Sequence, residues 1–265
     1  MPGSVQHRET VMGTVVTFDI YPRPGTTDAQ LAEVRPQLAA AVAILHRADE
    51  VFSTWQPDSP VSRLRRGEVT VAEAPAEVAE VMAACAAARE ASGGWFDPWA
   101  LPGGFDPTGY VKGWAAQRAL TAFGADWMAG TIVNAAGDIA SCGRQPTGQV
   151  FRIGIADPAA PRQLAEIAEL TGAIATSGSY ERGAHLTDPR SGQPAARAAS
   201  ATVTGPDLGL ADALATALAV AGEPGLEFIE ALADYEALVI GFDGHRTRTR
   251  HFPTAAAQRR EGQRR

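Results

Sequence analysis

The stretch LGLADALATALAV, residues 208–220, decides how the fold of this chain is interpreted. Its leucines and alanines predict a buried helix, in which Asp212 is the single ionisable residue. Thr216 follows four residues later and therefore lies on the same face, one turn away. A carboxylate without a partner is unfavourable in apolar surroundings. The stretch therefore predicts a cation, backbone N–H groups or water beside Asp212.

Asp212 also has an explanation that needs no ligand. If the helix follows a loop at residues 205–207, Asp212 falls in the first turn, where the helix dipole stabilises a carboxylate by about 0.3–1 kcal/mol. The position alone leaves both explanations open, so the other residues of the chain must decide between them.

The composition is that of an ordinary globular protein. A chain of 265 residues with 45% hydrophobic residues can bury a large core, in one large domain or two small ones. The net charge of -7 argues against a nucleic-acid partner, because neutralising phosphates requires a basic face. Four arginines are concentrated in the polar stretch 256–265, which we expect to be a disordered basic tail.

The cysteines and the apolar segments bear on the compartment. Cys85 and Cys142 are too few for a disulfide framework or a metal cluster. The first residues lack the apolar core of a signal peptide, and no run of about 18 apolar residues occurs elsewhere. We therefore expect a cytoplasmic protein with no membrane partner.

Helical and strand patterns alternate along the chain, which predicts a mixed α/β or α+β fold. No linker clearly divides the sequence, so we expect one domain over residues 1–255. A loop rich in glycine and proline at residues 92–114 contains three tryptophans, which argue for order. The expected helices are 29–51, interrupted or started by Pro36, then 74–91, 111–123, 208–220 and 225–233. The expected strands are 11–21, 131–139, 150–155, 172–176, 199–204, 237–242 and 247–252.

The segment ATSGSYERGAHLTDPRSGQP, residues 175–194, combines several hydroxyl groups with His185 and Arg190. Each has an ordinary explanation, because Asp-Pro-Arg-Ser-Gly favours a turn and a lone histidine is usually not catalytic. Together, a hydroxyl-rich turn, a histidine and an arginine suit a ligand that carries phosphate.

Nine motifs follow one another between residues 12 and 218. They are MGT (12–14), FSTWQPDSPVSRL (52–64), GGWFDP (93–98), DPTGYVKGWAAQRA (106–119), VNAAGDIASCG (133–143), RIGIADP (152–158), IATSGSYER (174–182), HLTDPRSGQP (185–194) and ADALATAL (211–218). In this order they resemble the ApbE family, the magnesium-dependent FAD:protein FMN transferases. The resemblance implies an α+β fold in which helices pack on mixed β-sheets around a flavin cleft.

The resemblance also implies the metal ligands. Asp212, Thr216 and the backbone of Gly109 correspond to the positions that bind Mg²⁺ in the family. One turn of helix places a carboxylate and a hydroxyl on the same face, and Mg²⁺ prefers such oxygen ligands. The resemblance therefore favours a metal as the partner of Asp212.

Flavin-site positions of the family correspond to ten further residues or segments. An indole offers a flat apolar face, carboxylates accept hydrogen bonds from hydroxyl groups, and an ammonium offsets phosphate charge. Two of the residues also have ordinary roles, since Trp55 can simply pack and Lys112 can be a solvated residue at the start of a helix. The residues are Met12, Trp55, Trp95, Phe96, Asp97, Asp106, Lys112, Ser177, Tyr180 and His185.

The implied reaction is displacement at phosphorus. A Ser or Thr hydroxyl of an acceptor protein attacks the FMN-side phosphorus of FAD, and AMP leaves. We expect Asp212 to act in catalysis with His185 as general base, because imidazole exchanges protons near neutral pH. Two alternatives stay open: a Mg²⁺-dependent FAD pyrophosphatase that gives FMN and AMP, and an FAD-binding protein without turnover. The connection at residues 99–104 is shorter than in the family, which puts acceptor recognition in question.

Overall fold

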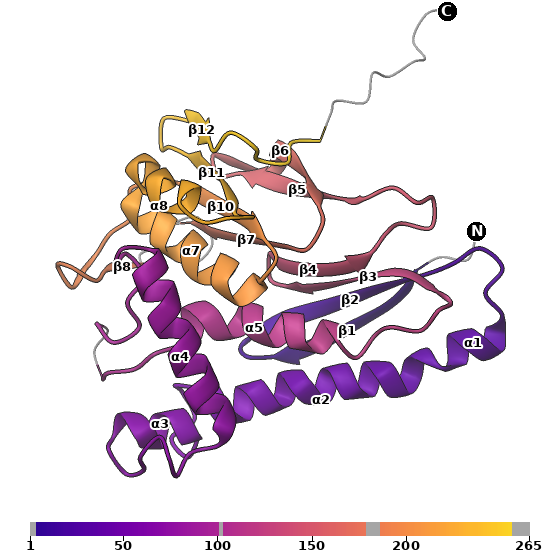
Figure 1. Cartoon of the computed structure of the whole chain (residues 1–265), viewed down its shortest axis with the longest axis horizontal. Coiled ribbons are helices and arrows are strands. Elements are labelled where there is room, and N and C mark those ends of the chain that lie inside the picture. The colour runs from indigo at the N-terminus through magenta and orange to yellow at the C-terminus, as the bar shows by residue number, and fades with distance from the viewer. Residues whose placement is uncertain (1–3, 101–102, 179–185, 256–265) are drawn as a thin grey trace, which may run out of the picture.

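The structure is a computed structural model that describes residues 4–100, 103–178 and 186–255. Within these residues an antiparallel sheet of eight strands forms the centre, with helices on one face (Figure 1). In spatial order its strands are β1 (Val5–Val11), β2 (Thr14–Pro22), β3 (Met128–Ala135), β4 (Asp138–Gly143), β7 (Ala173–Gly178), β10 (Ser200–Gly205), β11 (Glu236–Ile240) and β12 (Arg246–Arg248).

Two helices lie directly on this sheet. Helix α5 packs on β3 and β4, α7 packs on β7 and β10, and the two helices contact each other. Helix α2 packs on α5, while α4 contacts both α5 and α7. The helices are α1 (Asp28–Ala32), α2 (Val34–Phe52), α3 (Pro60–Arg65), α4 (Ala76–Ala91), α5 (Thr108–Leu120), α7 (Leu208–Ala221) and α8 (Leu226–Glu230), with a 3₁₀ turn at Glu223–Gly225.

The opposite face of the sheet is covered by a hairpin of β5 (Phe151–Asp157) and β6 (Ala160–Leu170). Successive side chains of a strand point to opposite faces. Ile174 accordingly packs with Phe151 of the hairpin, whereas its neighbours Ala173 and Ala175 pack in the helical core. The chain therefore forms three layers: hairpin, sheet and helices. A further sheet of two strands, the β8–β9 ribbon, consists of β8 (Thr187–Asp188) and β9 (Gln193–Pro194).

The expected α+β class is confirmed, but the sheets are not mixed. Every strand pair recorded for the described residues is antiparallel. The reason is connectivity, because β1–β2 and β3–β4 are joined directly by tight turns, which only antiparallel neighbours allow.

These tight turns correct two of the expected strands. The segment 11–21 contains a turn at Met12-Gly13, with φ of 53° and 67°, and β1 precedes it. The segment 131–139 contains a similar turn at Ala136-Gly137, with φ of 53° and 99°. Two consecutive residues with positive φ form the two-residue hairpin turns that match strand twist. Methionine and alanine are poor signals for such turns, so the sequence pattern predicts one continuous strand where the structure has a hairpin.

Other elements also differ from expectation. Residues 160–170 form the unexpected strand β6, and residues 60–65 form the unexpected helix α3. Helix α5 begins at Thr108, three residues before the expected start, so Gly109 lies in its first turn. The expected helix at 29–51 is divided into α1 and α2, with Pro36 in the first turn of α2. The expected basic tail at 256–265 lies outside the described residues.

The helices of the described residues are all too short or too polar to cross a membrane. Both cysteines are free: Cys85 is buried in α4, and Cys142 is exposed near the end of β4.

Candidate functional site

A cavity of about 430 Å³ lies where α5 and α7 meet the end of the sheet. Cavities of roughly 300–1,000 Å³ typically bind small ligands. Nine of the predicted site residues line it: Trp95, Phe96, Asp97, Asp106, Gly109, Lys112, Ser177, Asp212 and Thr216. The other lining residues are Thr14, Pro98, Thr108, Ala136, Thr176, Leu186, Thr187 and Pro189.

Helix α7 places Asp212 and Thr216 in this cavity, one turn apart as expected. Asp207 caps the helix by accepting the Leu210 N–H at 2.7 Å, so Asp212 lies beyond the first turn. The helix-end explanation for the Asp212 carboxylate therefore does not apply, because the dipole effect fades within the first turn. Only 3% of Asp212 is exposed, so its charge requires compensation inside the protein.

Two contacts join Asp212 to α5. Its Oδ2 accepts the Gly113 N–H at 3.3 Å and lies 3.5 Å from Lys112 Nζ. The helices approach this closely because residue 113 is glycine: a Cβ there would lie 2.4 Å from the Leu208 carbonyl oxygen.

Gly109 lies beside Thr216. A Cβ at Gly109 would be 3.7 Å from Thr216 Oγ1 and 3.2 Å from the Phe96 ring. Thr216 Oγ1 is also 3.3 Å from Ser177 Oγ on β7. A carboxylate, two hydroxyl groups and a backbone segment therefore converge from three elements. Such oxygen donors fit a hard divalent cation such as Mg²⁺.

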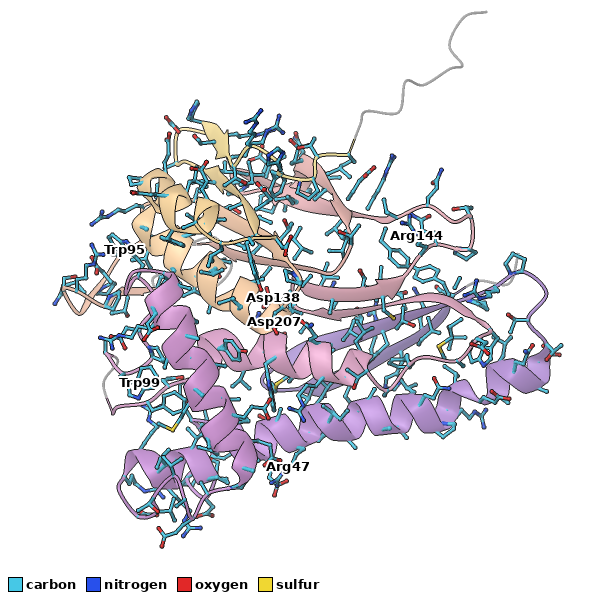
Figure 2. All side chains as sticks on the ribbon, in the orientation of Figure 1. Arg47, Trp95, Trp99, Asp138, Arg144 and Asp207 are labelled. Carbon is cyan, nitrogen blue, oxygen red and sulfur yellow. The ribbon has the colours of Figure 1, made fainter. Side chains whose placement is uncertain are left out.

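Lys112 is the cationic side chain among the described lining residues, and its main partner is not one of the predicted site residues. Lys112 Nζ forms an ion pair with Oδ2 of Asp138, at the start of β4. The other Asp138 oxygen accepts the Thr176 N–H at 3.3 Å. Figure 2 shows Asp138 at the centre of the molecule, near the N-terminal end of α7. Its signal in the sequence was an aspartate directly after the Ala136-Gly137 turn.

The predicted aspartates of the two Phe-Asp-Pro repeats are both held by protein partners. Asp97 accepts the Trp99 N–H at 2.9 Å and pairs with Arg89 at 2.8 Å. Asp106 accepts the Thr108 N–H at 3.1 Å and pairs with Arg65 at 3.3 Å. These contacts order a loop that lacks regular structure. They also orient both carboxylates at the cavity edge.

Trp95 forms part of the rim. The Arg190 guanidinium lies 3.7 Å from the centre of its indole ring, and that of Arg197 lies 5.1 Å away. Such cation–π contacts join the β8–β9 ribbon to the segment after α4. Figure 2 shows Trp95 beyond the C-terminal end of α4. Arg190 was noted in the sequence for its phosphate chemistry, but in the structure it covers an indole.

Two predicted residues that the structure describes do not line the cavity. Trp55 is 92% exposed after the end of α2, and Met12 packs against the main core in the β1–β2 turn, two residues before the lining residue Thr14. Tyr180 and His185 lie outside the described residues. No cluster of three or more His, Cys, Asp or Glu side chains suited to a metal occurs in the described part of the chain.

Comparison with known proteins gives a consistent result. The sequence model of the ApbE family matches residues 12–104 and 101–239. None of the curated proteins compared with the chain matches it. Among solved structures, the fold is similar to the ApbE protein of Thermotoga maritima, with a TM-score of 0.79 and 22% identity over 93% of this chain and 97% of that one.

Two structures with functional names are also similar. Flavin transferase ApbE from Vibrio cholerae has a TM-score of 0.76 and 22% identity, over 93% of this chain and 97% of that one. Flavinyl transferase ApbE from Pseudomonas stutzeri, in its apo form, has a TM-score of 0.76 and 26% identity, over 93% and 94% of the two chains. The likenesses confirm the three-layer α+β architecture.

Proposed function

The chain belongs to the ApbE family, and from this premise we propose that it transfers FMN from FAD to a Ser or Thr hydroxyl of an acceptor protein in a Mg²⁺-dependent reaction that releases AMP. The related proteins of Vibrio cholerae and Pseudomonas stutzeri bear the names flavin transferase and flavinyl transferase. Their names supply the reaction class of this proposal.

One observation carries the proposal for this chain. Asp212, Thr216 and Gly109 come together with Lys112 on one wall of a 430 Å³ cavity. An anionic oxygen cluster next to an ammonium suits a divalent cation together with a diphosphate. The cavity also lies at the N-terminal end of α5, where the helix dipole favours negative charge.

We assign the following roles to these residues. Asp212 and Thr216, with the backbone of Gly109, would hold Mg²⁺, which when bound supplies positive charge to phosphate oxygens. Lys112 and the start of α5 orient the diphosphate of FAD. The acceptor hydroxyl forms a new O–P bond at the FMN-side phosphorus, and the P–O bond to AMP breaks. The hydroxyl proton goes to His185, which we retain as the proposed general base.

Incubation of the purified protein with FAD and MgCl₂ tests the reaction class. With an acceptor protein that carries an aspartate upstream of a Ser or Thr, the context preferred in the family, we expect the acceptor to gain the mass of FMN and AMP to appear. AMP with free FMN, and no labelled acceptor, would support the pyrophosphatase alternative. FAD binding without AMP under both conditions would support a binding protein without turnover.

The remaining parts of the proposal concern the whole chain. We propose one ApbE-like domain over residues 1–255 with a tail at 256–265, supported by a main core that runs from β1 to β11. The net charge of -7 argues against nucleic acid as a partner. A cytoplasmic location remains a prediction, which cell fractionation tests.

A further inference from the structure

Two buried carboxylates lie on either side of the Lys112 ammonium. Asp138, on β4, is 1% exposed, and Asp212, on α7, is 3% exposed. Lys112 Nζ pairs with Oδ2 of Asp138, while Oδ2 of Asp212 lies further away, at 3.5 Å. The ammonium therefore lies between the sheet and α7, within ion-pair distance of both carboxylates.

The charges of this group matter because both carboxylates are buried, so water screens them only weakly. One ammonium and two carboxylates carry a net charge of -1, and the Lys112 side chain is 23% exposed. A buried ion pair that loses one partner leaves an uncompensated charge. Without Asp138, the carboxylate that the described residues place next to Lys112 is Asp212. The ammonium would then neutralise the group expected to hold the metal.

We infer that Asp138 is a positioning residue that holds Lys112 on the sheet side of the cavity, so that Asp212 keeps its negative charge for a divalent cation. The inference rests on the proposed function, because it assumes that Mg²⁺ and FAD bind in this cavity. Asp138 also accepts the Thr176 N–H at 3.3 Å, which fixes its carboxylate relative to β7. It thereby sets the metal affinity without contacting the metal.

Asp138→Asn is the main test, because the amide keeps an oxygen for the Thr176 N–H but loses the charge that holds Lys112. MgCl₂ is titrated into the full chain with saturating FAD, and flavin fluorescence and the thermal unfolding temperature are recorded. We expect the Mg²⁺ concentration at half-saturation to rise about tenfold or more. Asp157→Asn is the control: it also removes one carboxylate charge, but on β5, on the far face of the sheet. It should leave the Mg²⁺ concentration at half-saturation unchanged.

The double variant separates positioning from simpler effects. Lys112→Met changes the diphosphate site, so FAD is raised to saturation for each variant and Lys112→Met is the reference for the double variant. If Asp138 acts only by holding Lys112, adding Asp138→Asn to Lys112→Met should change the half-saturation by less than about threefold. A further tenfold loss in that background would show a general charge effect or a purely structural role. That result overturns the inference.

Two further measurements keep the result decisive. If Asp138→Asn does not fold, Asp138→Glu, which keeps the charge, should bind Mg²⁺ within about threefold of wild type; a tenfold loss in that folded variant contradicts the inference. A wild-type chain that shows no Mg²⁺ effect on bound FAD removes the proposed function together with the inference. If the wild-type chain responds to Mg²⁺ and Asp138→Asn responds at the same Mg²⁺ concentration, only the role of Asp138 is wrong, and the proposed function stands.

Discussion

At residue 212 a single carboxylate connects α7 to α5 and faces the cavity. Asp212→Asn keeps an acceptor for the Gly113 N–H but removes the charge. We expect Mg²⁺-dependent AMP release to fall by about 100-fold or more, because charge stabilisation by a metal contributes several kcal/mol. The measurement is AMP release at saturating FAD, with the unfolding temperature as a check on folding. Unchanged AMP release in a folded variant would remove Asp212 from the metal site.

The two cysteines provide a second test at residue scale. Burial, with a smaller contribution from the charge of Asp106, raises the pKa of the Cys85 thiol to about 12. Only the thiolate reacts with disulfide reagents, so Cys85 should be inert in the folded chain at pH 8. Cys142 is exposed, although local desolvation also raises the pKa of its thiol, and it should react slowly.

We therefore expect one thiol per native chain to react with dithionitrobenzoate and the second to react only in denaturant. Cys142→Ser should abolish the native reaction. Two thiols reacting at equal rates in the native chain would contradict the burial of Cys85 in α4.

At the scale of elements, the contact between α5 and α7 determines the geometry of the site. A Cβ at position 113 would lie 2.4 Å from the Leu208 carbonyl oxygen and 3.2 Å from Asp212 Cβ. Gly113→Ala should therefore separate the helices and lower the free energy of unfolding by about 1–3 kcal/mol, despite the better helix propensity of alanine. Urea unfolding measures the change.

Gly124 offers a matched control for this substitution. It follows α5, and a Cβ there would meet nothing within 4 Å. Gly124→Ala should change the free energy of unfolding by less than about 0.5 kcal/mol. Equal effects of the two substitutions would mean that the helices do not need their close approach. In that case the Gly113 N–H would not be required to orient Asp212.

For the whole molecule, the two faces of the sheet have different tasks. Phe151 is 3% exposed and packs in the cluster between the hairpin and the sheet, away from the cavity. Phe151→Ala should cost about 3–5 kcal/mol of stability. FAD binding at a temperature where the variant is folded should not change, because the cavity lies on the helical face. Thermal unfolding and flavin fluorescence measure the two quantities separately.

Leu164, on the same hairpin, is 60% exposed and serves as the control. Leu164→Ala should leave the unfolding temperature nearly unchanged. If Phe151→Ala weakens FAD binding in the folded protein, the hairpin supports the site through the sheet, and the division of tasks is wrong.

The sequence by itself determined the local parts of this protein. Helix α7, with Asp212 and Thr216 on one face, follows from spacing within a single turn, and α4 follows from an alanine-rich pattern that begins after Pro75. Nine predicted site residues line the cavity. They could be predicted because a series of sequence motifs can be recognised without knowing how the motifs are arranged in space.

Only the tertiary structure decided how distant segments meet. The Lys112–Asp138 pair and the Gly113–Asp212 hydrogen bond join residues that neither periodicity nor spacing relates. The sequence also did not predict strand β6 or the turns at Met12-Gly13 and Ala136-Gly137. Pairing with neighbouring strands stabilises these segments although their own residues do not favour these conformations. Helical periodicity is a local property, whereas the pairing of buried charges depends on which strands and helices become neighbours.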